Sequence, residues 1–138
     1  MKRVLVDTGP LVALCDARDR LHSRATAELD RLTGPLFLGL PNLTEACFLL
    51  PDPGLRRRMS ALLEREVLQL AAPRNGDEMT RRTLKWLARY AEHAPDFADG
   101  FLTCWAESDA SLSVWTFDRE FSTLWRTLSG KKIRLAFD

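Results

Sequence analysis

The sequence has few of the side chains that build a zinc site or a disulfide framework. It contains 3 cysteines and 2 histidines in 138 residues, and none of them has the close Cys–Cys or Cys–His spacing of a zinc module. Cys15, Cys47 and Cys104 lie far apart in apolar stretches. We therefore expect buried free thiols in a reducing cytosol, not a secreted domain held by disulfides.

Long apolar runs and a strong excess of charge are also missing. No stretch is long enough to cross a membrane, and the first residues lack the apolar segment of a signal peptide. The formal net charge is only +1, so any surface for nucleic acid must be local. No glycine-rich phosphate loop is present. We expect a cytoplasmic protein without membrane contact.

What is present is the pattern of a single α/β domain spanning residues 1–138. Hydrophobic residues make up 46% and charged residues 28% of the chain, which is ordinary for a globular domain. Short apolar runs predict strands at 4–6, 36–40, 67–71, 113–117 and 133–137. Helical patterns lie between them, including 21–32, 55–66, 77–92, 97–107 and 118–128. This alternation predicts a three-layer α/β/α sandwich around a mostly parallel central sheet of four to five strands.

The first strand is followed directly by an acid. Val4 to Val6 is a continuous apolar run, as in a strand buried on both faces. Asp7 ends this run, and Thr8 or Gly9 can cap the helix that follows. Asp7 therefore belongs to the carboxyl edge of the sheet, where open α/β sheets bind their ligands.

Three further acids interrupt apolar patterns. Glu45 lies in an almost wholly apolar helix, for which Asn42 can serve as the cap. Asp99 lies in the first turn of a later apolar helix, and Asp118 directly follows the fourth strand. Because the carboxyl ends of parallel strands meet at one edge, we expect these acids to converge with Asp7.

Such a group of four carboxylates needs compensation. Carboxylates that share a pocket repel each other, and some stay protonated unless a cation is present. Ligand sets made only of oxygen favour Mg²⁺ or Mn²⁺ over zinc. A cation of this kind lowers the pKa of a bound water and stabilises the oxygens of a reacting phosphodiester. The pattern therefore indicates a metal-dependent hydrolase that acts on phosphodiesters.

Each acid also has a purely structural interpretation. Asp7 and Asp118 can be helix caps at strand-to-helix junctions. Asp99 can complement the helix dipole, with Asp96 as the cap three residues earlier. Glu45 can pair with an arginine. The metal hypothesis depends on all four acids reaching one edge of the sheet.

These residues and their order resemble the PIN-domain family, in particular the VapC-type toxins of toxin–antitoxin pairs. The resemblance covers nearly the whole chain. Its strongest motifs are the segments 6–14, 96–100 and 116–121, and a looser match is 41–45. The chain differs from the usual pattern at Gly100, where the family more often has alanine.

The resemblance implies a Mg²⁺- or Mn²⁺-dependent endoribonuclease. Carried over by position, Asp7 and Asp99 are the principal metal ligands, and Asp118 completes the metal site directly or through water. Glu45 binds metal or orients the attacking water. The resemblance also implies an RNA substrate, a small antitoxin as partner, and a homodimer.

Other residues are secondary candidates around these four acids. The hydroxyls of Thr8 and Thr116 can hydrogen-bond the carboxylates, and Asp96 is a nearby acid without an assigned role. Arg119 is the best candidate for a phosphate contact near the metal. His22 fits a structural role better than that of a general base.

Alternative functions remain at this stage. A haloacid-dehalogenase-like phosphatase needs a second Asp two residues after the first, where this chain has Gly9. A stand-alone PIN nuclease in RNA processing would carry the same acids. A non-catalytic PIN-like binding module would be expected to lack one or more of them.

Overall fold

The computed structural model describes residues 2–138, which form one α/β unit with a four-stranded, all-parallel sheet in the order β3-β2-β1-β4. The strands are β1 (Arg3–Val6), β2 (Leu36–Leu38), β3 (Gln69–Leu70) and β4 (Leu112–Trp115). The helices are α1 (Thr8–Cys15), α2 (His22–Arg31), α3 (Leu40–Leu49), α4 (Pro53–Glu64), α5 (Gly76–Arg89), α6 (Phe97–Ser108) and α7 (Glu120–Thr123), with a 3₁₀ turn at Ala91–His93. The predicted fold class is confirmed.

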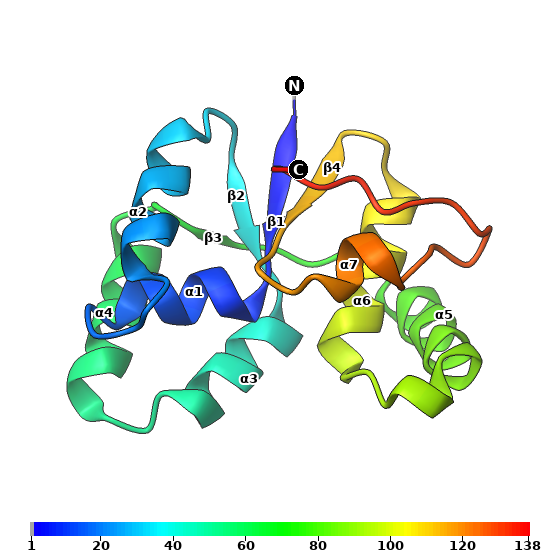
Figure 1. Cartoon of the computed structure of the whole chain (residues 1–138), viewed down its shortest axis with the longest axis horizontal. Helices are drawn as coiled ribbons and strands as arrows, with labels where there is room; N and C mark the ends of the chain where they lie inside the picture. Colours follow the sequence, from blue (N-terminus) through cyan, green and yellow to red (C-terminus); the bar gives the residue numbers. More distant parts are fainter. Residues whose placement is uncertain (1) are drawn as a thin grey trace.

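Helices cover both faces of the sheet. Figure 1 shows α1, α2 and α4 on one side and α5, α6 and α7 on the other. The alternation along β1 explains this arrangement, because Val4 and Val6 enter the core beneath α1 to α4 while Leu5 enters the core beneath α5 and α6. A strand buried on both faces is the mark of a parallel sheet between helices.

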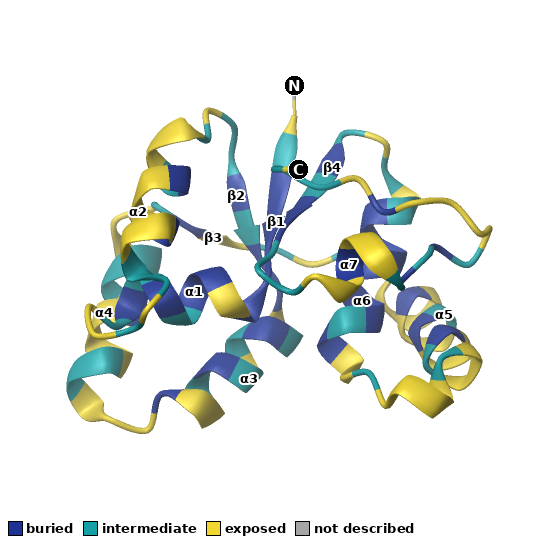
Figure 2. Cartoon of the chain, viewed as in Figure 1, coloured by how far each residue is buried: buried dark blue, intermediate teal, exposed yellow. Residues whose placement is uncertain are grey.

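Burial follows the layers. In Figure 2 the strands β1, β2 and β4 are dark blue and teal, whereas the outward sides of α2 and α5 are largely yellow. All four tryptophans, at positions 86, 105, 115 and 125, are buried. Cys15 and Cys104 are buried free thiols, but Cys47 is only half-buried. Within residues 2–138 no helix is long and apolar enough to span a bilayer.

The starts of two helices that border the predicted site decide between the expected caps. Asp7 caps α1, as its structural interpretation expects and in place of Thr8 or Gly9, because its side chain accepts a hydrogen bond from the Thr8 N–H. Gly39 is the N-cap of α3, and Asn42 is a fully buried residue inside that helix. The cap assigned to Asn42 was therefore wrong, since its side chain is used elsewhere.

The C-terminal part of the chain also departs from the prediction. The helix expected over 118–128 is reduced to α7, and the strand expected over 133–137 is a single parallel bridge between Val114 and Leu135. After α7 the chain turns back on itself, with an antiparallel bridge between Arg126 and Lys132. Glu107 of α6 holds this turn by accepting hydrogen bonds from the backbone of 128 and 129.

Candidate functional site: an acidic cavity at the carboxyl edge of the sheet

Asp7 is the most buried acid of the predicted set. Asp7 is only 6% exposed. It lies between the end of β1 and the start of α1, and its backbone N–H donates to the carbonyl oxygen of Trp115 in β4 at 2.9 Å. The Oδ1 atom accepts from the Thr8 N–H at 2.8 Å, and Oδ2 accepts from the Thr116 hydroxyl at 2.7 Å. Two neutral donors therefore orient the Asp7 carboxylate, one from the residue after Asp7 and one from the residue that follows β4.

Asn42 is a further member of this network that the sequence interpretation missed. Its Nδ2 donates to Asp7 Oδ1 at 3.0 Å and to Thr8 Oγ1 at 2.9 Å. These bonds tie the first turn of α3 to the junction between β1 and α1. The signal in the sequence was a polar amide three residues before Glu45 in an apolar helix, which we attributed to capping.

Asp99 enters the site from the start of α6. Its Oδ2 accepts from the Asp96 N–H at 3.0 Å, so one carboxylate oxygen satisfies a free backbone donor at the start of the helix. The structural interpretation of Asp99 is correct to this extent. It does not account for the position of the residue, which faces the same cavity as Asp7.

Glu45 and Asp118 complete the set from two other elements. Glu45 lies half-buried in the middle of α3. Asp118 follows β4, where its N–H donates to Thr116 Oγ1 at 2.9 Å and its Oδ1 accepts from the Glu120 N–H at 2.9 Å. Thr116 thus links Asp118 to Asp7. In residues 2–138 neither Glu45 nor Asp118 is paired with an arginine or lysine.

The four acids line one cavity of about 310 Å³. Its polar lining residues are Asp7, Thr8, Asp19, Glu45, Asp96, Asp99 and Asp118. Figure 1 shows that the starts of α1 and α3 and the element α6 gather at the end of β1, where these residues are carried. Among the predicted secondary candidates, Thr8 and Asp96 line the cavity and Thr116 lies behind Asp7. Arg119 is not among the lining residues and borders a neighbouring groove.

Asp19 and His22, which follow α1 in the chain, differ in their relation to the cavity. Asp19 lines the cavity, a position that the sequence analysis did not predict. His22 does not line it; its Nδ1 lies 2.6 Å from the carbonyl oxygen of Ala13. The structural role expected for His22 agrees with this contact.

The cavity concentrates negative charge. Burial raises the pKa of Asp7, and the nearby Asp118 carboxylate raises it further, against the lowering effect of the donors Thr116, Thr8 and Asn42. Burial also raises the pKa of Asp99 to about 7, with added repulsion from Asp7, Asp96 and Asp118. The pKa of Glu45 is raised by burial and by Asp96 and Asp7. Among the residues that line the cavity there is no lysine, arginine or histidine.

The donor set consists of oxygens. Carboxylates and hydroxyls are the ligands that hard divalent cations prefer. The carboxylates surround the cavity from different sides, and within residues 2–138 no three His, Cys, Asp or Glu side chains are already grouped closely enough to enclose an ion. In the described part of the chain, the Oδ1 atom of buried Asn42 has no hydrogen-bond partner.

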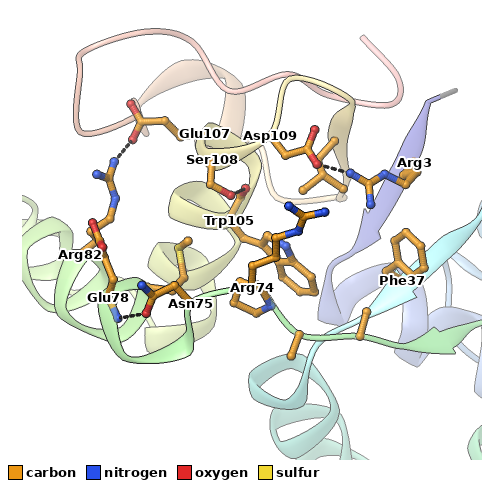
Figure 3. Close-up of a pocket in the computed structure, with 15 residues that line it drawn as sticks. Arg3, Phe37, Arg74, Asn75, Glu78, Arg82, Trp105, Glu107, Ser108 and Asp109 are labelled. Carbon is orange, nitrogen blue, oxygen red and sulfur yellow. Dashed lines mark hydrogen bonds and ion pairs between the residues drawn. The ribbon is translucent and has the colours of Figure 1, made fainter.

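A second cavity, beside the amino ends of β1 and β4, has a different character. It measures about 670 Å³ and its wall includes Phe37 and Trp105. Figure 3 shows two ion pairs in its wall, Arg3 with Asp109 and Arg82 with Glu107, and Arg74 and Glu78 add one charge of each sign. Because positive and negative side chains balance each other in this cavity, no bound ion is needed to offset their charge. The unbalanced acids at the carboxyl edge are therefore the better candidate for a functional site.

Comparison with known proteins agrees with this architecture. At the level of sequence, no family model and no curated protein matches the chain. Among solved structures, it is similar to Mycobacterium tuberculosis VapC20, a toxin that cleaves the sarcin–ricin loop, with a TM-score of 0.71 and 20% identity over 85% of this chain and 91% of that one. It is also similar to FitAcB from Neisseria gonorrhoeae, with a TM-score of 0.53 and 19% identity over 84% of this chain and 88% of that one. The chain therefore has the fold of the VapC-type PIN domains.

Proposed function

We propose that this protein is a Mg²⁺- or Mn²⁺-dependent endoribonuclease. The observation that carries the proposal is the acidic cavity, in which buried and half-buried carboxylates repel each other and the described lining residues include no basic side chain. Keeping several partly buried carboxylates together without a cation is costly. A divalent ion removes this cost, and the oxygen ligands suit Mg²⁺ or Mn²⁺.

Each residue then has a definite task. Asp7 and Asp99 are proposed as the principal ligands, with Asp118 and Glu45 completing the site directly or through water. Thr116 and Asn42 hold the Asp7 carboxylate in a single orientation through the bonds described above. When bound, the cation would lower the pKa of a water molecule and stabilise the oxygens of the phosphodiester.

Two similarities support RNA as the substrate. The motifs 6–14, 96–100 and 116–121 resemble those of VapC-type ribonucleases, and the fold is that of VapC20, which is described as cleaving the sarcin–ricin loop. On the same grounds we propose that the chain is the toxin of a toxin–antitoxin pair in the cytoplasm, with a small antitoxin as partner and a homodimer as its assembly. A stand-alone nuclease is the alternative, and a short neighbouring gene with a DNA-binding pattern would favour the toxin.

The test is cleavage of single-stranded RNA by the purified protein with Mn²⁺ or Mg²⁺. Asp7→Asn and Asp99→Asn keep the shape of the side chain but remove a charged ligand. We expect each to lower the cleavage rate by at least about 100-fold, because the lost stabilisation amounts to several kcal/mol. Asp30→Asn, an exposed change on α2, is the control.

Equal cleavage by wild type and both cavity variants would refute the proposal. If the wild type does not cleave RNA with either metal, the nuclease proposal is refuted and a non-catalytic PIN-like binding module becomes the favoured function.

A further inference from the structure

A groove of about 640 Å³ adjoins the acidic cavity. It is formed by the segment after β4, the C-terminal segment and α2, and its charged or aromatic lining residues include Arg24, Phe117, Asp118, Arg119, Lys132 and Arg134. Phe117 and Asp118 line both spaces. A ligand that passes over Asp118 therefore extends from the acids directly into this groove.

The groove has the opposite charge to the cavity. Four of its lining residues are cations, and its acidic lining residues are Asp118 and Asp138. A polyanion repelled by the carboxylates of the cavity would gain attraction from the cations of the adjoining groove.

Arg24 is held in place in this groove. Its Nε donates to Glu28 Oε2 at 2.7 Å, and its guanidinium carbon lies 4.6 Å from the centre of the Phe117 ring. Glu28 is in turn anchored, because its other oxygen accepts from the Trp115 indole N–H at 2.8 Å. Because these contacts already fix the Arg24 side chain, its remaining N–H groups can bind a ligand with little further loss of side-chain entropy.

The other cations divide into two kinds. Arg134 donates to the backbone carbonyls of Leu112, Ala106 and Asp109, so its guanidinium is used to hold the end of α6. Arg119 and Lys132 are exposed, and within residues 2–138 their side chains make no hydrogen bond or ion pair. These two cations are free to contact a ligand.

We propose that this groove, which we call the Arg119–Lys132 groove, binds the phosphates of single-stranded RNA on one side of the bond to be cleaved. The inference rests on the proposed function, because it uses the acidic cavity to place that bond. Arg119, Lys132 and Arg24 are positioning residues that hold the strand across Asp118. The face of Phe117 is already covered by Arg24, so the groove contacts the backbone of the strand and does not stack a base on that face.

The experiment measures binding separately from cleavage. A fluorescein-labelled single-stranded oligouridylate is titrated with the full chain in EDTA over a series of salt concentrations, and binding is followed by fluorescence anisotropy. The double variant Arg119→Ala/Lys132→Ala is compared with Arg57→Ala/Arg81→Ala, which removes two exposed arginines of α4 and α5. We expect the first pair to weaken binding about tenfold at low salt and to flatten the salt slope by about 1.4, the value for two lost phosphate contacts on a single strand. The second pair should match the wild type.

The cleavage kinetics give an independent result. With Mn²⁺ present, a loss of positioning should raise KM while kcat changes little. Equal affinity and equal salt slopes for the wild type and Arg119→Ala/Lys132→Ala would overturn the groove proposal, even if the wild type still cleaves RNA. An equal loss in the control pair would also overturn it, since binding would then depend on overall charge. A wild type that neither binds nor cleaves RNA would instead refute the proposed function together with this inference.

Discussion

Thr116 is the clearest test of how single residues support the acidic cavity. Its hydroxyl donates to Asp7 Oδ2 at 2.7 Å and accepts from the Asp118 N–H at 2.9 Å. Valine has almost the same shape but can make neither bond. Groups that orient a metal ligand in this way contribute about 10- to 100-fold to metal affinity or activity.

We therefore predict that Thr116→Val weakens Mn²⁺ binding or slows RNA cleavage by about 10- to 100-fold while the protein stays folded. Isothermal titration with Mn²⁺ and the RNA cleavage assay measure these effects. Thr26→Val, which changes an exposed threonine of α2, is the matched control. Unchanged affinity and unchanged cleavage in Thr116→Val would show that Asp7 does not need this donor.

At the scale of the element, Gly100 explains how α6 reaches the site. A Cβ atom at this position would lie 2.8 Å from Trp86 Cε3 and 3.2 Å from Thr83 Cγ2, both on α5. The Trp86 ring has no room to move, because it is fully buried and packs against Tyr90 and Trp125 with ring centroids 4.8 and 5.1 Å away. The departure from the family pattern at Gly100 is thus a packing requirement of this chain.

Gly100→Ala should consequently lower the free energy of unfolding. The helix propensity of alanine stabilises by about 1 kcal/mol, but overpacking a core costs about 1–3 kcal/mol, and we expect a net loss of about 1 kcal/mol. Urea denaturation measures this change. Gly76→Ala is the control, since nothing lies within 4 Å of its added Cβ; greater stability in Gly100→Ala would contradict the packing argument.

The elements that could be predicted from sequence are those specified by local pattern. The junction of β1, Asp7 and α1 is one, because an apolar run, an acid and a helix start follow each other directly. The parallel topology also predicts that Asp7, Glu45, Asp99 and Asp118 line one cavity, which they do, while their role as metal ligands stays a prediction. The role of Asn42 was missed, because a buried amide with distant partners has the same local pattern as a cap.

The C-terminal segment shows a second reason why prediction from sequence failed in part of the chain. The periodicity over 118–128 continued past Thr123, but the chain there is held by Glu107, whose Oε2 accepts from the Ser129 hydroxyl at 2.6 Å. Such a contact between residues far apart in sequence leaves no periodic signal. Arg119 was predicted from the sequence as a phosphate contact. The rest of the Arg119–Lys132 groove depends on the C-terminal segment, so Lys132 could not be predicted beside it.

At the scale of the whole molecule, the acidic cavity makes stability depend on pH. Burial, with repulsion from Asp7, raises the pKa of Asp99 from 3.8 to about 7. Well below pH 3.8 this group is protonated in both the folded and the unfolded chain. As the pH rises towards 7 the unfolded chain ionises first, so the folded state loses stability, and the loss is complete above pH 7.

We predict that Asp99→Asn abolishes this part of the pH dependence. In EDTA, the Tm of the variant should exceed that of the wild type by an amount that grows between about pH 4 and pH 7. Thermal unfolding followed by circular dichroism at a series of pH values measures the difference. Parallel curves for the two proteins would mean that Asp99 ionises normally in the folded chain.

The four carboxylates of the acidic cavity are proposed to bind a hard divalent cation together. The most direct measurement is Mn²⁺ binding by electron paramagnetic resonance, in which free Mn²⁺ is counted as protein is added. We predict saturable binding to the wild type and to Asp30→Asn, and loss of that binding in Asp7→Asn and Asp99→Asn. Equal binding by all four proteins, or none by the wild type, would contradict the account.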